Sequence, residues 1–319
     1  MPLAPVASRV HPSDFSWSDS EIAADLRRIT DAATEADGRA PLNEAALLAL
    51  RHHGLARATL FVAHGAGVES SVAGFAVVHT ASGTQEPADL NLVVSPEFRR
   101  RGVGGLLAAR VSDELAATPL SAWSHGNHPG AAALAARNGF ARVRDLWVMR
   151  RPLPQNLPVD LPPLDRTADG IDVRPFRPGT DEEAVLAVNA RAFADHPEQG
   201  AMTLADLRER EREPWFDPAG FFLAWRGDRL LGFHWTKVHG AAQGEVYVLG
   251  VDPDAQGSGL GRLLTLTGLH HLAGRGVDEV ILYVEADNAP AVAVYTRLGF
   301  THAAADTDVM YQRAGRPPA

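Results

Sequence analysis

The sequence predicts an α/β (α+β) protein made of two tandem, related domains, and three observations support this. First, two apolar, β-branched runs end at Pro96 and at Pro253, and a glycine-containing turn and a helical pattern follow each of them. Second, both copies close alike after an alanine-rich stretch, at Phe140 and at Phe300, each preceded by glycine. Third, 319 residues are enough for two domains that each bury a core.

Within each copy the order of elements is strand, glycine turn and helix. The periodic spacing of leucines predicts the two helices after the turns at residues 106–115 and 260–272. Start signals and apolar periodicity predict four more helices, at residues 20–33, 43–53, 180–194 and 203–213. Polar and apolar residues alternate over 171–176, which predicts a half-buried strand.

Five prolines between Arg151 and Gly170 mark a boundary, because proline stiffens a linker and cannot donate to a sheet. The predicted division is a first domain at 1–150, a linker at 151–170 and a second domain at 171–319.

The two glycine turns have a chemistry of their own. Amides at the start of a helix, with the positive end of the helix dipole behind them, form a site for phosphate or pyrophosphate. Glycine-rich turns also occur where nothing binds, and Arg99, Arg100 and Arg101 could equally be a solvated turn. The repetition of the turn favours the ligand site.

These residues resemble the GCN5-related N-acetyltransferase (GNAT) superfamily. Its pyrophosphate loop has Gln or Arg, two residues, Gly, one residue, and Gly or Ala, which residues 99–104 and 256–261 both match. A later pattern of the family is met by Asn288, Ala291, Tyr295, Gly299 and Phe300. The resemblance implies two GNAT domains, each with a mixed, mostly antiparallel central sheet flanked by helices, and acetyl-CoA as cosubstrate.

Comparing the copies separates their roles. Glu245 stands eight residues before Pro253, where the first copy has Ala88; Tyr295 stands four before Gly299, where the first copy has Ala135. N-acetyl transfer needs a base for the amine proton and an acid for the departing thiolate. Glu245 could instead be a solvent-facing strand residue and Tyr295 a packing aromatic. Since both are absent from the first copy, we expect the second domain to be catalytic.

Longer runs in the second half, at residues 192–200, 215–218, 230–239 and 244–253, resemble the mycothiol synthase family of tandem acetyltransferases. This resemblance implies acetylation of the cysteinyl amine of cysteinyl-glucosaminyl-inositol, with Glu245 as base and Tyr295 as acid. It also implies a second acetyl-CoA site without catalysis in the first domain.

Site residues follow from the same resemblance. The implied acetyl-CoA contacts of the second domain are Leu249, Gly250, Val251, Gln256, Gly257, Ser258, Gly259, Leu260, Gly261, Arg262 and Asn288. Those of the first domain are Leu92, Val93, Val94, Arg100, Arg101, Gly102, Val103, Gly104 and Gly105. The implied acceptor contacts are Asp37, Glu198, Lys237, Glu245 and Tyr283. A polyhydroxylated acceptor suits such charged and polar groups, although Asp37, followed by Gly38, could also be a turn residue.

Composition narrows the class of protein. A formal charge of -9 and a pI near 5.8 argue against broad binding to nucleic acid or anionic membranes. There is no cysteine, hence no disulfide, thiolate metal site or cysteine nucleophile, and the histidines have no metal-ligand spacing. No apolar stretch is long enough to span a bilayer and no signal-peptide pattern opens the sequence. We expect a cytoplasmic, monomeric enzyme without a metal.

Two points stay open. Gly257 and Ser258 occupy loop positions where the family commonly has basic residues, so the loop would hold pyrophosphate through amides, the helix dipole and Arg262. The rival functions are acetylation of another amine, such as an aminoglycoside, a polyamine or a protein N-terminus, and noncatalytic sensing of CoA.

Overall fold

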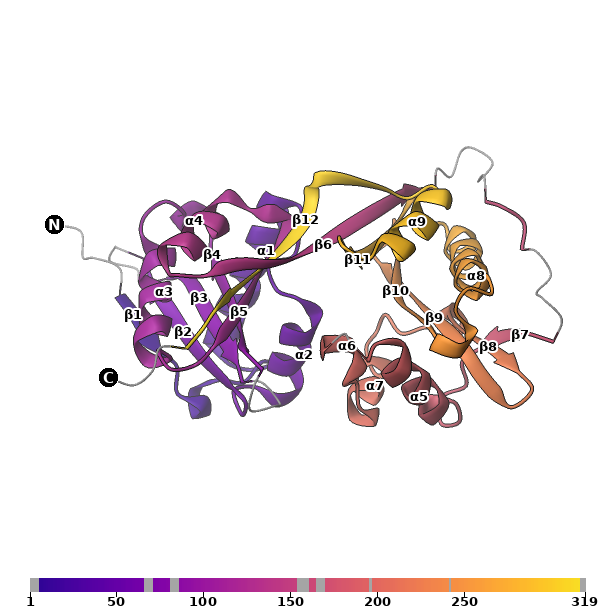
Figure 1. The fold of residues 1–319 in the computed structure, drawn as a ribbon. Helices are drawn as coiled ribbons and strands as arrows, with labels where there is room; N and C mark the ends of the chain where they lie inside the picture. Colours follow the sequence, from indigo (N-terminus) through magenta and orange to yellow (C-terminus); the bar gives the residue numbers. More distant parts are fainter. Residues whose placement is uncertain are drawn as a thin grey trace. The chain divides into compact units, whose positions relative to one another are not determined.

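The computed structural model describes residues 6–65, 71–80, 86–153, 161–164, 170–194, 197–240 and 242–315, except the side chains of residues 197 and 198. The chain forms two compact units (Figure 1). Unit 1 comprises Met1–Leu146 and Ala304–Ala319, and unit 2 comprises Trp147–Ala303.

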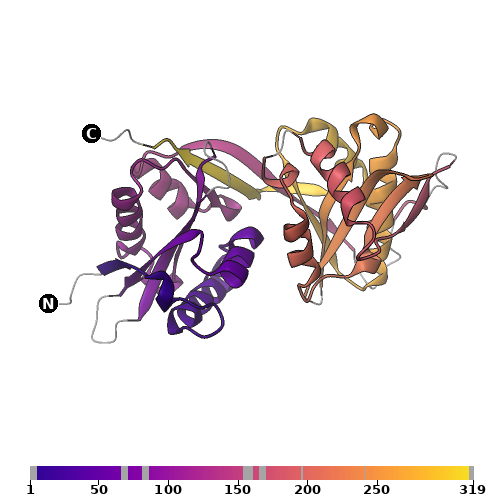
Figure 2. The same cartoon turned by 90° about the horizontal axis from the view of Figure 1, so that it is seen from below.

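Unit 1 is a mixed sheet with helices on both faces (Figures 1 and 2). Its strands, in spatial order, are β1 (Val6–Arg9), β2 (Ala58–His64), β3 (Val72–His79), β4 (Ala88–Val94), β5 (Leu120–Ser124) and the end of β12 (Thr301–Arg313). Its helices are α1 (Glu21–Asp37), α2 (Glu44–His53), α3 (Val103–Glu114) and α4 (Pro129–Arg137). Only the β4–β5 pair is parallel among these neighbours. Ile29 of α1 and Leu50 of α2 share one core with Phe75, whereas Leu107 of α3 packs with Phe61 in a second core.

Unit 2 repeats this design. Its strands, in spatial order, are β6 (Ala141–Pro152), β11 (Glu279–Glu285), β10 (Gln243–Val251), β9 (Arg229–His239), β8 (Phe221–Arg226) and β7 (Asp172–Pro175). Its helices are α5 (Glu182–Ala192), α6 (Pro197–Gly200), α7 (Leu204–Glu211), α8 (Leu260–Gly274) and α9 (Ala289–Arg297). The β10–β11 pair is parallel, and the pairs from β10 to β7 are antiparallel. Val185 of α5 and Leu207 of α7 belong to one core, and Leu266 and Leu269 of α8 belong to another.

Four helices, α1, α2, α7 and α8, begin within one residue of their predicted starts, whereas α3 begins at Val103 rather than at residue 106 and α5 at Glu182 rather than at residue 180. The side chain of Ser20 accepts a hydrogen bond from the Ala23 amide at the start of α1, and Asn43 caps α2 in the same way. Thr203 and Asp206 form a reciprocal capping box at α7. Helix α1 runs to Asp37, beyond the predicted residue 33, and ends at Gly38, whose φ of +69° is the left-handed conformation of a helix end.

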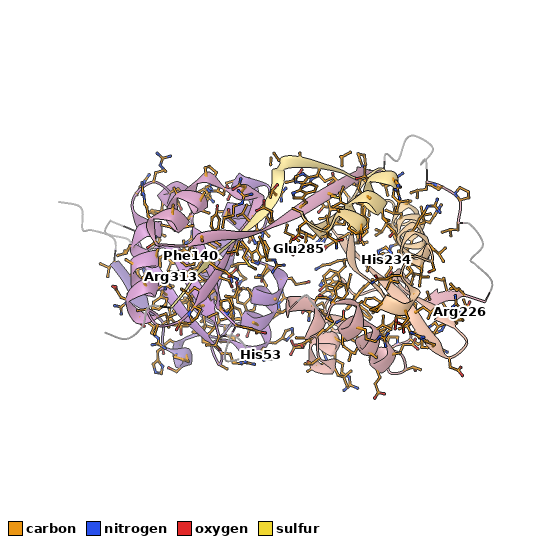
Figure 3. The ribbon with its side chains drawn as sticks, in the orientation of Figure 1. His53, Phe140, Arg226, His234, Glu285 and Arg313 are labelled. Atoms are coloured by element: carbon orange, nitrogen blue, oxygen red, sulfur yellow. The ribbon has the colours of Figure 1, made fainter. Side chains whose placement is uncertain are left out.

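Two strands carry the chain from one unit to the other. Strand β6 passes the boundary between Leu146 and Trp147, and β12 passes it between Ala303 and Ala304. Residues 309–313 of β12 pair antiparallel with β5 of unit 1. Arg313, near the end of β12, donates to the Ser112 hydroxyl at 2.7 Å and lies over the Phe140 ring (Figure 3). Residues 304–313 of the last strand are therefore part of the first unit.

The units thus differ from the predicted division, which assigned all of 171–319 to the second domain. Residues 147–150 belong to unit 2 and residues 304–319 to unit 1. Most of the predicted linker, residues 154–160 and 165–169, lies outside the described residues. The predicted fold class is confirmed, since each unit has a mixed, mostly antiparallel sheet between helices. In the described part of the chain, no helix combines the length and apolarity that crossing a bilayer requires.

Candidate active site

Both glycine turns fold alike and end at an open helix start. Each strand leads through a short 3-10 turn, Pro96–Phe98 or Pro253–Ala255, to a glycine at the helix N-cap. The N-cap glycines, Gly102 and Gly259, have φ of +87° and +83°, and neither has a side-chain cap in the described structure. First-turn amides without a side-chain partner, at the positive end of the helix dipole, are suited to an anion such as pyrophosphate.

The first residue of each loop anchors it to the strand before it. Arg99 donates from Nε to the Val94 carbonyl at 3.2 Å, and Gln256 donates from Nε2 to the equivalent Val251 carbonyl at 3.5 Å. The next residue is left-handed in both loops, with φ of +63° at Arg100 and +75° at Gly257. Glycine adopts this conformation without strain, whereas arginine does not. Gly257 therefore suits the backbone of the turn, although it lacks the charge of Arg100.

The parallel strands separate next to each loop. Pairing of β10 with β11 covers Gln243 to Val246, and pairing of β4 with β5 covers Ala88 and Asp89. The remainder of β10 and of β4 has no partner from the parallel neighbour in the described register. An extended chain with amide groups can pair with such an edge as an added strand. The predicted pantetheine contacts, Leu249 to Val251, lie on this part of β10.

A β-bulge in β10 sets the face on which its side chains lie. The register with β9 shifts between Val246 and Val248. Val246 packs in the core formed by α8, whereas Tyr247 and Val248 both pack in the core formed by α5 and α7. Because side chains alternate along a strand, Glu245 shares the α5–α7 face with Tyr247. In unit 1, β3 and β4 pair without a shift, and Ala88 packs in the α3 core.

Glu245 is a nearly buried carboxylate in a polar and aromatic setting. It is 6% exposed and is the cross-strand partner of Lys237. Its Oε2 atom lies 2.5 Å from Nε2 of His239. Lys237 is 8% exposed, and its ammonium lies 4.1 Å from the centre of the Trp215 ring and 5.0 Å from that of Tyr247. Such cation–π contacts hold the lysine beside the carboxylate.

Tyr295 lies on α9 within the core that includes α8 and Val246. Its ring contacts Phe300 edge to face, with 5.9 Å between ring centres. Burial raises the pKa of Tyr295 to about 12, so its hydroxyl keeps its proton at neutral pH. A neutral phenol can donate that proton, which is what the predicted acid requires.

The other predicted residues of unit 2 have varied settings. Tyr283 on β11 is 46% exposed. Asn288 is the N-cap of α9, where its side chain accepts from the Ala291 amide at 3.2 Å. The side chain of Glu198 lies outside the described residues. Among the described residues, no group of three or more His, Asp or Glu side chains could hold a metal ion.

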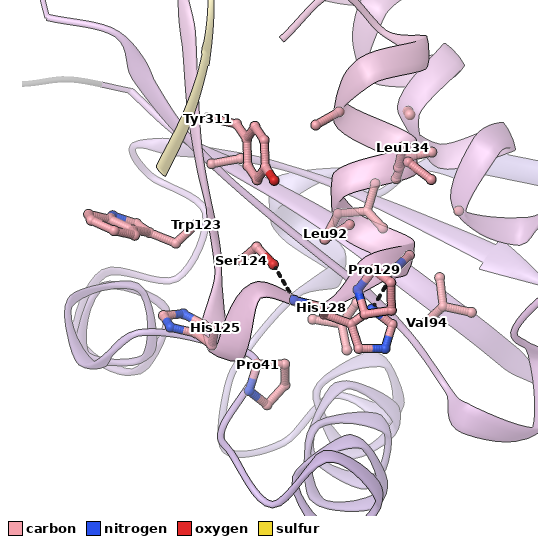
Figure 4. Close-up of a pocket in the computed structure, with 18 of the residues that line it drawn as sticks. Pro41, Leu92, Val94, Trp123, Ser124, His125, His128, Pro129, Leu134 and Tyr311 are labelled. Atoms are coloured by element: carbon pink, nitrogen blue, oxygen red, sulfur yellow. Dashed lines mark hydrogen bonds between the residues drawn. The ribbon is translucent and has the colours of Figure 1, made fainter. Parts of the chain in front are cut away.

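Unit 1 contains a cavity of about 880 Å³ beside its own glycine loop (Figure 4). The predicted contacts that line it are Leu92, Val93, Val94, Arg100, Gly102, Gly104 and Gly105. Two other predicted contacts lie elsewhere: Val103 is buried in the α3 core, and the Arg101 guanidinium lies over the Phe98 ring. His128 and Leu134 of the loop and helix after β5 complete one wall (Figure 4). The lining of the cavity combines apolar side chains with arginines and with the amides at the start of α3.

Asp37 lines the same cavity and is paired. Its two carboxylate oxygens accept from the two Nη atoms of Arg99, both at 2.7 Å. This two-pronged ion pair joins the end of α1 to the loop that precedes α3. Sequence spacing offered no sign of it, because 62 residues separate the partners.

Comparisons with known proteins identify the family. The model of the acetyltransferase (GNAT) family matches residues 24–140 and 190–300. A mycothiol acetyltransferase of Catenulispora acidiphila is 53% identical over 91% of this chain and 94% of its own. Another, of Thermomonospora curvata, is 55% identical over 89% of this chain and 91% of its own. The chain belongs to the mycothiol acetyltransferases of the GNAT family. As a GNAT enzyme it is an acetyl-CoA-dependent N-acetyltransferase.

Solved structures of tandem or related proteins share the fold. A tandem GNAT protein from the clavulanic acid biosynthesis pathway superimposes with a TM-score of 0.74, at 21% identity, covering 98% of this chain and all of the other. A GCN5-related N-acetyltransferase from Sphaerobacter thermophilus gives a TM-score of 0.68 at 23% identity, covering 99% and 97% of the two chains. Identities this low support the architecture alone.

The structure brings Glu245 and Lys237 together and adds neighbours that sequence reasoning did not select as site residues. These are His239, Trp215 and Tyr247, which contact the carboxylate or the lysine. The spacing of Glu245, Tyr247, Lys237 and His239 at alternate positions of two strands was a signal for a shared face. The bulge and the strand register show that these four side chains lie on the same face.

Proposed function

We propose that unit 2 transfers the acetyl group of acetyl-CoA to the cysteinyl amine of cysteinyl-glucosaminyl-inositol, which yields mycothiol and CoA. The observation that carries this proposal is the position of Glu245, a buried carboxylate that is the cross-strand partner of Lys237. It lies on β10, which pairs with β11 only over residues 243–246. The names of the relatives support the choice of acceptor.

The base acts first. The α-amine of a cysteinyl group has a pKa near ~8, so Glu245 has only a fairly acidic ammonium proton to remove, directly or through a water. The free amine then attacks the thioester carbonyl; a C–N bond forms and the C–S bond breaks. Tyr295, whose phenol is protonated at neutral pH, gives its proton to the departing thiolate. Two protons leave the nitrogen and one ends on CoA, so each turnover releases one proton.

The remaining groups bind and orient. Residues 249–251 accept the pantetheine arm along the open edge of β10, and the amides of residues 256–261 hold the pyrophosphate with help from Arg262 and the α8 dipole. Lys237, Tyr283 and Glu198 supply hydrogen bonds to the acceptor hydroxyls. The predicted role of Asn288 at acetyl-CoA is shared with its role as a helix cap.

Unit 1 takes a different part. We propose that its cavity binds acetyl-CoA without transfer, because Ala88 and Ala135 replace the base and the acid. An unbulged β4 supports this, since a side chain at position 88 points into the α3 core. We also expect a cytoplasmic monomer; light scattering at working concentration checks the monomeric state.

The decisive experiment measures CoA release and acetylated product from a panel of amines. Cysteinyl-glucosaminyl-inositol should give a kcat/KM at least tenfold above that of an aminoglycoside, a polyamine or an N-terminal peptide. Preference for one of these amines would reassign the acceptor. Binding of acetyl-CoA with no turnover on any amine would favour a CoA-sensing role.

A further inference from the structure

We propose that His239 is the positioning residue of the general base: its Nε2–H holds one oxygen of Glu245 and leaves the other for the amine proton. The inference rests on the proposed role of Glu245. His239 is the last residue of β9, and the proposed transfer reaction gives it no role so far.

The contact is direct and isolated. His239 Nε2 lies 2.5 Å from Glu245 Oε2, and this is the one hydrogen bond of the Glu245 carboxylate within the described residues. The two side chains share the α5–α7 face, because His239 alternates with Lys237, the cross-strand partner of Glu245. The His239 side chain is 38% exposed, whereas that of Glu245 is 9% exposed.

The direction of the bond follows from the chemistry of its partners. An ionised carboxylate only accepts hydrogen bonds, so the ring nitrogen that faces it carries the hydrogen. A bond to a charged group is short and strong, and it selects one rotamer of a side chain that has three rotatable bonds. With Oε2 engaged, Oε1 is the oxygen available to the ammonium.

Two substitutions that both introduce an amide, His239→Gln and His239→Asn, distinguish a positioning role from an effect of side-chain volume. In glutamine the amide nitrogen lies at the same distance along the side chain as Nε2 of histidine, whereas in asparagine it lies at the place of Nδ1. His239→Gln therefore restores a donor to Oε2, and His239→Asn does not reach it. Because orientation of the base affects the chemical step, kcat should change and the two KM values should stay within about twofold.

The test compares His239→Ala, His239→Asn and His239→Gln with the wild-type chain, in steady-state assays with acetyl-CoA and cysteinyl-glucosaminyl-inositol. We expect kcat to fall roughly 10–100-fold in the Ala and Asn variants, a part of the 10²–10⁴-fold that a general base contributes. The Gln variant should recover to within about threefold of wild type. His52→Ala, at an exposed histidine of α2, is the matched control and should behave as wild type.

Each outcome has one meaning. A wild-type kcat in His239→Ala, or equal rates in the Asn and Gln variants, would overturn the positioning role. Melting temperatures identify any variant that fails to fold. If His239→Ala does not fold, the rates of His239→Gln and His239→Asn are compared with each other. If the wild-type chain itself does not acetylate the cysteinyl amine, the proposed function fails; if it does and the histidine variants are unaffected, only this inference fails.

Discussion

Val246 and Val248 lie two residues apart on one strand and pack against opposite faces of its sheet. In a regular strand they would share a face. The bulge between them places Glu245 beside Lys237 rather than under α8. In unit 1 the corresponding pairing is regular, and Ala88 faces the α3 core. The proposed restriction of catalysis to unit 2 therefore rests on backbone register as well as on side-chain identity.

The first prediction concerns the base. Glu245→Gln keeps shape and hydrogen-bonding capacity but cannot take a proton, so kcat should fall by roughly 10²–10⁴-fold while acetyl-CoA binding stays within about twofold. Steady-state kinetics and calorimetric titration measure the two quantities. Glu21→Gln, at an exposed position of α1, is the control. A near wild-type rate for the Glu245 variant at neutral pH would remove the residue from the mechanism.

The second concerns the acid. Tyr295→Phe removes one hydroxyl and keeps the contact with Phe300, so the fold should be retained while acetyl transfer slows by roughly 10–100-fold. Single-turnover mixing with saturating acetyl-CoA isolates the chemical step. An unchanged single-turnover rate would mean that Tyr295 only packs.

The third concerns Asp37, whose carboxylate is paired with Arg99. If Asp37 binds the acceptor, Asp37→Ala should raise the acceptor KM about tenfold and leave the acetyl-CoA KM nearly constant. Arg99→Ala removes the same ion pair but retains the carboxylate, which makes it the matched comparison. Equal kinetic effects of the two variants would indicate that the ion pair, rather than acceptor binding, is what matters.

The fourth concerns the loop backbone. Gly257 has φ of +75° and open space where a Cβ atom would lie, so Gly257→Ala should lower stability by about 1 kcal/mol through backbone strain alone. Gly105→Ala adds the same methyl group in helix α3, where space is also open and the conformation is helical, and should raise stability by up to about 1 kcal/mol. Urea unfolding midpoints check both. Shifts of the same sign would contradict the strain argument.

The fifth is a pH effect from His234, a fully buried histidine in the interior of unit 2 (Figure 3). Burial lowers its pKa from 6.5 to about 4, although Nδ1 bonds the Leu264 carbonyl at 2.7 Å. Between these two pH values the unfolded chain binds a proton on this histidine that the folded chain does not. The contribution of neutral His234 to the free energy of unfolding is therefore complete above about pH 6.5 and is lost as the pH falls toward 4.

His234→Asn keeps a donor for the Leu264 carbonyl and does not titrate in this range. The wild-type chain should therefore lose on the order of 3 kcal/mol more than the variant between pH 6.5 and 4. Unfolding midpoints at a series of pH values measure the difference. Parallel pH curves for the two proteins would contradict a neutral buried His234.

Local patterns predicted much of the fold and part of the site. Start signals at Ser20, Asn43 and Thr203 placed three helices to within one residue of their starts, because a cap depends on side chains a few positions away. The boundary was harder: β12 begins in unit 2 and ends beside β5, a pairing over about 190 residues that no local pattern encodes.

By itself, the sequence determined the duplication, the two glycine loops and the restriction of a carboxylate and a phenol to the second copy, since these depend on identity and short spacing. Only the tertiary structure decided which face Glu245 occupies, that His239 bonds it, and that Asp37 pairs with Arg99. The physical reason is strand register: one extra residue in a strand reverses the face of every side chain before it, and long-range pairing rather than local propensity decides where that residue lies.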